Sequence, residues 1–179
     1  MKKAVVLIAS AACAVLMCTT GAFARNNTSQ NINETDKLFL KALAPSNEAD
    51  IQISRMAAST TKNPQVRDLA NTVLSGDVLL QSHVRHLADQ TGVSLPTSID
   101  TPDVHLKDTL KSDASNQNAF DRAYVQAMLD KFHAAVNYFR IEATQTNDPS
   151  LRTFAQANLP KLEKTLDKIE SVSANLPPA

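Results

Sequence analysis

The sequence predicts an all-α protein: a four-helix bundle of the ferritin-like kind, built from two antiparallel helical hairpins joined by a long crossover. Three observations support this class. Apolar residues recur at helical spacing over four long segments. After residue 24 only two glycines remain, Gly76 and Gly92, which disfavours a many-stranded sheet. The stretch NPQVRDLA at 63–70 is echoed by DPSLRTFA at 148–155.

The first 24 residues have the features of a secretory signal peptide. Two lysines follow Met1, the apolar run AVVLIASAACAVLM comes next, and small residues precede a cleavage position after Ala24. The run is shorter than the roughly 20 residues that cross a bilayer, so an uncleaved anchor is the less favoured alternative. Lipidation at Cys18 is disfavoured because Met17 before it is not small. We therefore expect a periplasmic or secreted protein.

The chain that remains after cleavage has the size of one domain. Both cysteines lie in the leader, so neither a disulfide nor a thiol nucleophile is expected in the mature protein. The absence of a basic stripe argues against nucleic acid as a partner. The chain has no second apolar run after the leader, so no transmembrane segment is expected in the mature protein. The predicted divisions are a signal peptide at 1–24, a disordered lead-in at 25–34, a helical domain at 35–173 and a tail at 174–179.

The first predicted hairpin covers residues 35–91. Thr35-Asp36 is a plausible helix cap, and apolar residues follow it at helical spacing. Pro45 either kinks one helix or separates a short helix at 36–44 from a longer one that begins at Ser46. Asn63-Pro64 begins the next helix, because Asn accepts bonds from free amides and Pro suits the first helical position. That helix is expected to end at Thr91, before a left-handed Gly92.

The second predicted hairpin follows a Pro-rich crossover at 93–117, in which one or two helical turns are expected around 104–111. A helix is predicted from Asn118 to Thr146, and another begins at Asp148-Pro149 and is kinked by Pro160. The longest apolar stripe lies on the first of these two helices and consists of Phe120, Tyr124, Met128, Phe132, Ala135, Phe139 and Ala143. These side chains are expected to face the core.

The two similar stretches belong to a longer internal match. Aligning residues 51–70 with 136–155 gives six identities: Arg55/Arg140, Ala58/Ala143, Thr61/Thr146, Pro64/Pro149, Arg67/Arg152 and Ala70/Ala155. Each copy spans the end of one helix, a tight turn and the start of the next helix. One interpretation is a repeated hairpin. The alternative is that such caps and apolar spacings recur by chance, and the four-helix prediction holds in either case.

Asp77 breaks the apolar pattern, because it falls on the same helical stripe as Val73, Leu80 and Val84. A carboxylate that faces a core is costly unless it is bonded or neutralised. The favoured interpretation places Asp77 at the bundle edge beside a Lys or Arg. The alternatives are an acid or ligand in a polar pocket and a buried structural hydrogen bond. Gly76 beside it indicates a tight approach of another helix or a small polar pocket.

No Glu-x-x-His pair of the di-metal bundles is present. The weak metal candidates are Asp77, His83, Asp130 and His133, with Glu163 as a further carboxylate, and their helical phases disagree. Asp130 lies on a polar face, and His83 lies off the apolar line of its helix, so surface roles are favoured. No Ser-His-Asp arrangement can be argued. We therefore expect no metal or other cofactor and no enzymatic activity.

The chain resembles the bacterial domain-of-unknown-function 4142 family, also called predicted outer membrane proteins, over roughly residues 35–172. The resemblance is carried by DKLFLKAL, NPQVRDLA, HLADQTGVSLP, FDRAYVQAML and LRTFAQANLPKLEKTL. It implies an exported, ferritin-like helical bundle and no established activity. The family's members usually have histidines at three positions that hold Asp77, Phe132 and Thr165 here. Asp77 thus occupies a position that the resemblance marks as polar, and Asp77 with Thr165 is a candidate polar pocket.

Together these observations predict an exported periplasmic bundle that is a non-enzymatic binding or envelope-stress module. Its partner would be a small ligand or an envelope protein. The alternative is a ferritin-like metal-binding bundle with a depleted ligand set.

Overall fold

The computed structural model describes residues 32–177, which form five helices and no strand. The helices are α1 (Glu34–Thr60), α2 (Pro64–Thr91), α3 (Thr101–Asp113), α4 (Gln117–Gln145) and α5 (Pro149–Asn175). The all-α class is confirmed. The predicted count of four is one short, because the crossover contains a helix of 13 residues where only one or two turns were expected.

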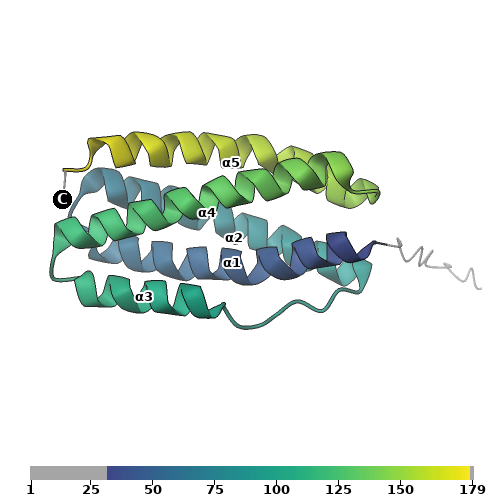
Figure 1. Cartoon of the computed structure of the whole chain (residues 1–179), viewed down its shortest axis with the longest axis horizontal. Helices are drawn as coiled ribbons and strands as arrows, with labels where there is room; N and C mark the ends of the chain where they lie inside the picture. Colours follow the sequence, from purple (N-terminus) through teal and green to yellow (C-terminus); the bar gives the residue numbers. More distant parts are fainter. Residues whose placement is uncertain (1–31, 178–179) are drawn as a thin grey trace, which may run out of the picture.

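The four long helices form two antiparallel pairs, α1 with α2 and α4 with α5 (Figure 1). The pairs pack on each other through contacts of α1 with α4 and of α2 with α5. The short helix α3 lies against α1 and α4. The α1–α2 turn and the α4–α5 turn lie at opposite ends of the molecule, so α1 and α4 run antiparallel (Figure 1).

The N-cap of α1 lies two residues before Thr35, the first residue of the predicted cap. Asn33 is the N-cap, and its side chain accepts a hydrogen bond from the Asp36 amide at 2.9 Å in a capping box. The last residues of the predicted lead-in are therefore part of the fold, and Ile32 is buried. The helix also continues through Pro45, so it is not divided there. Its buried positions on both sides of Pro45 pack against α2, which outweighs the one lost backbone hydrogen bond.

The predicted ends of α2 and α4 and the predicted start of α5 agree with the structure to within one residue. Gly92 follows α2 with φ 69°, in the left-handed region. Asn63 and Asp148 cap α2 and α5 with their side chains. Helix α5 continues through Pro160. The first residues of the predicted tail belong to this helix, while the predicted signal peptide lies outside the described residues.

The core is made of apolar side chains from all five helices. Phe120, Phe132 and Phe139 are buried, as the stripe predicts. Phe39, Phe139 and Phe154 form a cluster in which the ring centroids are 5.3 to 6.5 Å apart, a favourable aromatic spacing. None of the helices in the described part of the chain is both long and apolar enough to cross a membrane.

The two inter-helix turns repeat the same contacts. The Thr61 hydroxyl accepts from the Asn63 amide at 3.0 Å, and the Thr146 hydroxyl accepts from the Asp148 amide at 3.1 Å. In each turn the arginine six residues after the threonine, Arg67 or Arg152, donates to that threonine's carbonyl oxygen. Four of these six residues are the identical pairs of the internal match, so the similarity in sequence corresponds to a similarity in structure.

Candidate functional site

A cavity of about 440 Å³ lies between the first half of α1 and the second half of α4, and we call it the α1–α4 cavity. Its walls are mainly apolar and include Phe39, Leu43, Leu80, Phe132 and Phe139. Leu38 and Tyr138 also line it although they are 65% and 61% exposed, so this side opens to solvent. The polar side chains that line the cavity come from α1, α2 and α4 rather than from one helix.

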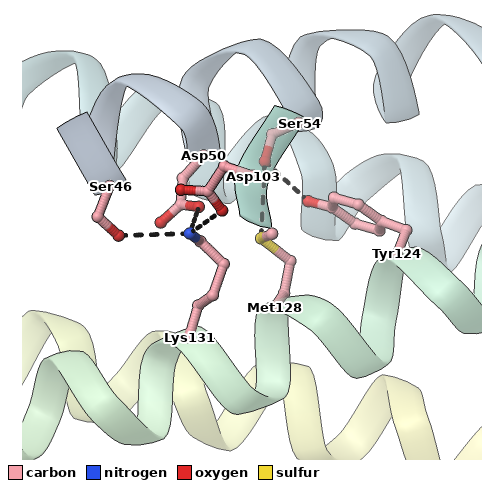
Figure 2. A network of polar contacts seen from close by, with 7 residues as sticks. All are labelled: Ser46, Asp50, Ser54, Asp103, Tyr124, Met128 and Lys131. Atoms are coloured by element: carbon pink, nitrogen blue, oxygen red, sulfur yellow. Dashed lines mark hydrogen bonds and ion pairs between the residues drawn. The ribbon is translucent and has the colours of Figure 1, made fainter. Parts of the chain in front are cut away.

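At one end of the cavity, Lys131 of α4 is surrounded by acceptors from two other helices (Figure 2). Its Nζ lies 2.7 Å from Asp103 Oδ1 of α3 and 3.1 Å from Asp50 Oδ1 of α1, and it donates to Ser46 Oγ at 3.3 Å. The three side chains Lys131, Asp50 and Asp103 are each less than one-fifth exposed. We call Lys131, Asp50, Asp103 and Ser46 the Lys131 cluster.

The Lys131 cluster contains two carboxylates and one ammonium. Burial raises the pKa of Asp50 to about 6, and the nearby Asp103 charge adds to this, while Lys131 opposes it. Burial lowers the pKa of Lys131, but the charges of Asp50 and Asp103 outweigh that effect, so the pKa of Lys131 is raised overall. Lys131 is therefore a persistent cation that joins α4 to α1 and α3.

Asp77 of α2 lines the same end of the cavity and is 4% exposed. Its Oδ2 atom is buried and has no hydrogen-bond partner. Burial raises the pKa of Asp77 well above its ordinary range, and the charge of Asp50 raises it further. The favoured expectation of an edge position with a cationic partner is therefore wrong. Lys131 lies close enough to oppose the shift but is bound to other acceptors.

The neutral donors nearest to Asp77 are used elsewhere. Both hydrogen bonds from Asn47 Nδ2 go to other atoms, the Asp77 backbone oxygen at 2.8 Å and Gln81 Oε1 at 3.0 Å. Gln81 Nε2 donates across to the Ala44 carbonyl oxygen at 3.2 Å. These bonds tie α1 to α2 beside Asp77. The Asp77 Oδ2 atom therefore has no hydrogen-bond donor among the described residues.

The opposite end of the cavity holds Glu142 of α4, which is 3% exposed. Burial raises its pKa to about 7, and the Asp36 and Asp148 charges add to this, while a hydrogen bond with Thr146 lowers it. Its Oε1 atom is buried and has no hydrogen-bond partner. The cavity therefore has carboxyl groups at both ends and apolar walls between them.

Nearer the C-terminal end of α1 than the Lys131 cluster, a second polar contact joins α1 to α4. Ser54 Oγ lies 3.0 Å from the Tyr124 hydroxyl, and both residues are fully buried (Figure 2). Burial raises the pKa of Tyr124, so this hydroxyl stays protonated. This hydrogen bond gives both buried hydroxyls a partner and fixes the position of α4 along α1.

The metal candidates from the sequence do not come together. His83 and Asp130 are exposed, and Asp130 accepts from Gln126. His133 is exposed and lies 3.7 Å from Glu170, while Glu163 pairs with Arg140. No group of three or more His, Cys, Asp or Glu side chains within residues 32–177 is arranged to hold a metal ion.

The three positions at which the family resemblance implies histidines do converge. Asp77, Phe132 and Thr165 all line a cavity of about 60 Å³ between α2 and α5, next to the α1–α4 cavity. Thr165 donates to the Lys161 carbonyl oxygen and does not bond to Asp77. Gly76 also lines this small cavity, and an added Cβ there would meet nothing within 4 Å. Of the two interpretations of Gly76, the tight helix approach is therefore wrong and the small polar pocket agrees with the structure.

The sequence pattern did not predict roles for Asp50, Asp103, Lys131 and Glu142. A usable signal existed for Asp50 and Glu142, since each lies among the apolar positions of its helix. For Asp103 and Lys131 no signal within one helix was available, because their pairing depends on how α3 packs against α4.

The family described as Domain of unknown function (DUF4142) matches residues 22–172. The match covers most of the chain, so the protein belongs to this family. Searches among curated proteins and among solved structures each found no match.

Proposed function

We propose that this member of the DUF4142 family is an exported, non-enzymatic binding protein that holds a small, largely apolar molecule in the α1–α4 cavity. The observation that carries the proposal is the cavity itself, which combines about 440 Å³ of space, apolar walls and a few buried polar groups. This combination is typical of small-molecule sites in proteins. The exposed side chains at its rim give a ligand access from solvent.

The location and topology belong to the same proposal. A leader with two lysines, an apolar run and a cleavage position after Ala24 supports export to the periplasm. Two helical pairs joined by a long crossover support a ferritin-like bundle to which α3 has been added. In this arrangement Asp103 of α3 pairs with Lys131 of α4 beside the cavity, and α3 also packs against α1.

The test uses Nile red, a neutral dye whose fluorescence rises in an apolar site. We expect saturable binding of one dye per mature protein. The variant Ala135→Phe places a large side chain on a residue that lines the cavity, and it should remove this binding. Its control is Ala157→Phe, which adds the same side chain at an exposed position on α5.

Loss of binding in Ala135→Phe but not in Ala157→Phe supports the proposal, provided that circular dichroism shows both variants folded. Absence of saturable binding, or equal binding by both variants, contradicts it.

A further inference from the structure

The end of the α1–α4 cavity near Lys131 has more carboxyl groups than cations. Asp50, Asp77 and Asp103 come from three different helices, and among residues 32–177 Lys131 is the one cation that acts on all of this group. Lys131 lies between Asp50, Asp103 and Ser46 (Figure 2). An ammonium has three donors, and three acceptors already surround this one. Asp77 is thus left without a cationic partner.

One carboxyl oxygen in this region, Asp77 Oδ2, is buried and lacks a hydrogen-bond partner. The neighbouring Asp50 Oδ1 has Lys131 Nζ as its partner, at 3.1 Å. Both residues line the α1–α4 cavity. Buried carboxyl oxygens are normally bonded, so a molecule in the cavity is the natural source of the partner that Asp77 lacks.

We propose that the α1–α4 cavity binds an organic amine, with its ammonium group at Asp77 and Asp50 and its apolar part along α1 and α4. This assignment rests on the proposed function and specifies its ligand class. A cation is favoured over a neutral donor because three carboxyl groups there have one ammonium between them. Hydrogen bonds between charged partners are also stronger than those between neutral ones.

The apolar part of the ligand has an elongated site. Lys131 and Glu142 mark the two ends of the cavity along α4, and the helix between them is about 16 Å long. Phe39, Leu43 and Phe139 line the intervening walls. An extended alkyl chain fits such walls, and its removal from water favours binding in proportion to the apolar area that is buried.

Binding of the amine is coupled to proton release. Burial raises the pKa of Asp77 well above its ordinary range in the empty protein, whereas an alkyl ammonium with an ordinary pKa of about 10.4 stays charged at neutral pH. Pairing with the ammonium favours the charged form of Asp77 and lowers this pKa again, so binding is accompanied by proton release. The charged groups facing Asp77 are Asp50 of α1 and Lys131 of α4, and Asp103 of α3 acts through them. On α5, Lys161 lines the adjacent small cavity and donates to Asn158.

The experiment compares octylamine with octan-1-ol, which have the same chain and differ in charge, as competitors of Nile red in the mature protein. The wild type should bind octylamine at least about tenfold more tightly than octan-1-ol. Asp77→Asn should remove this preference and leave octan-1-ol binding unchanged. Calorimetry in two buffers of different ionisation enthalpy should show proton release with octylamine in the wild type only.

Two controls keep the result specific. Asp68→Asn removes an exposed carboxylate from the same helix, where it pairs with Lys168, and it should keep the amine preference. Glu142→Gln replaces the carboxyl group at the opposite end of the cavity, whose Oε1 atom is also buried without a hydrogen-bond partner, and it should also keep the preference.

Equal binding of amine and alcohol by the wild type overturns the amine assignment while the proposed function stands, because the alcohol still binds. Loss of the preference in Glu142→Gln but not in Asp77→Asn overturns the choice of carboxylate. Failure of Nile red and of both octyl compounds to bind removes the proposed function itself.

Discussion

The two hairpins, α1–α2 and α4–α5, are alike at their turns and differ at the level of the cavity. The offset that aligns Asn63 with Asp148 also aligns the turn threonines and arginines, which make the same hydrogen bonds. The same offset aligns Asp50 with Ala135 and Asp77 with Leu162. The hairpins therefore share the residues that form their ends, and only the first of them contributes buried acids to the Lys131 end of the cavity.

This difference separates two roles. The repeated residues satisfy backbone groups at helix ends, which any helical hairpin requires. The unmatched residues bury charge, which stabilises a fold only when the charges are compensated. The cation that compensates them, Lys131, comes from the second hairpin, where its counterpart in the first is Ser46. The cavity therefore depends on both hairpins together.

The largest expected effect tests the compensating cation. Lys131→Met leaves Asp50 and Asp103 buried without a partner, so the free energy of unfolding at pH 7 should fall by about 3 kcal/mol. Urea denaturation measures this. Adding Asp50→Asn and Asp103→Asn to the same chain should restore most of the loss.

The control for this prediction is Lys164→Met, a change at an exposed lysine of α5, which should alter stability by less than about 0.5 kcal/mol. Equal stabilities of Lys131→Met and Lys164→Met would show that the Lys131 cluster contributes nothing to the fold.

The next effect concerns Glu142, whose counterpart in the first hairpin is Ala57. Its pKa of about 7 exceeds its ordinary value of 4.5, so the folded state holds the proton more tightly than the unfolded state. As the pH rises from about 4.5 to 7, Glu142 ionises in the unfolded state but not in the folded state, so the free energy of unfolding falls. Glu142→Gln avoids this cost, and it should be about 3 kcal/mol more stable than the wild type at pH 8.

At pH 4 the wild-type Glu142 is protonated, so the advantage of the Gln variant should disappear. Thermal unfolding across this pH range measures the difference. Glu163→Gln, at a partly exposed glutamate paired with Arg140, provides the control and should show no such growth with pH. A pH-independent difference for Glu142→Gln would mean that Glu142 titrates normally.

The smallest effect tests whether the two turns are equivalent. Thr61→Val and Thr146→Val each remove a hydroxyl that accepts from a backbone amide, so each should cost about 1 kcal/mol. Because the turns lie at opposite ends of the molecule, the double variant should show the sum of the two costs. Chemical denaturation of the three variants provides the measurement.

Thr61 also donates to Asp121 at 2.6 Å, and Thr146 makes a hydrogen bond with Glu142, so a moderate difference between the two losses is compatible with equivalent turns. A loss at one turn with none at the other would contradict the equivalence.

The sequence predicted most of the helices because their ends are decided locally. Asn63-Pro64, Asp148-Pro149 and Gly92 mark helix ends through the conformations and hydrogen bonds of a few neighbouring residues. Pro45 was ambiguous because a local rule allows a break there, whereas packing on both sides of it keeps α1 continuous. The length of α3 was underestimated for a similar reason, since its one buried residue, Leu110, provides little apolar pattern.

The sequence by itself determined that this protein is helical, where its four long helices lie and that Asp77 falls on an apolar stripe, because periodicity and capping act over a few residues. Only the tertiary structure decided which buried charges meet. Lys131 is far along the chain from Asp50 and Asp103, and its three neighbours are set by the packing of α1, α3 and α4. Electrostatic compensation depends on distances in space, and the pattern within a single helix carries no information about them.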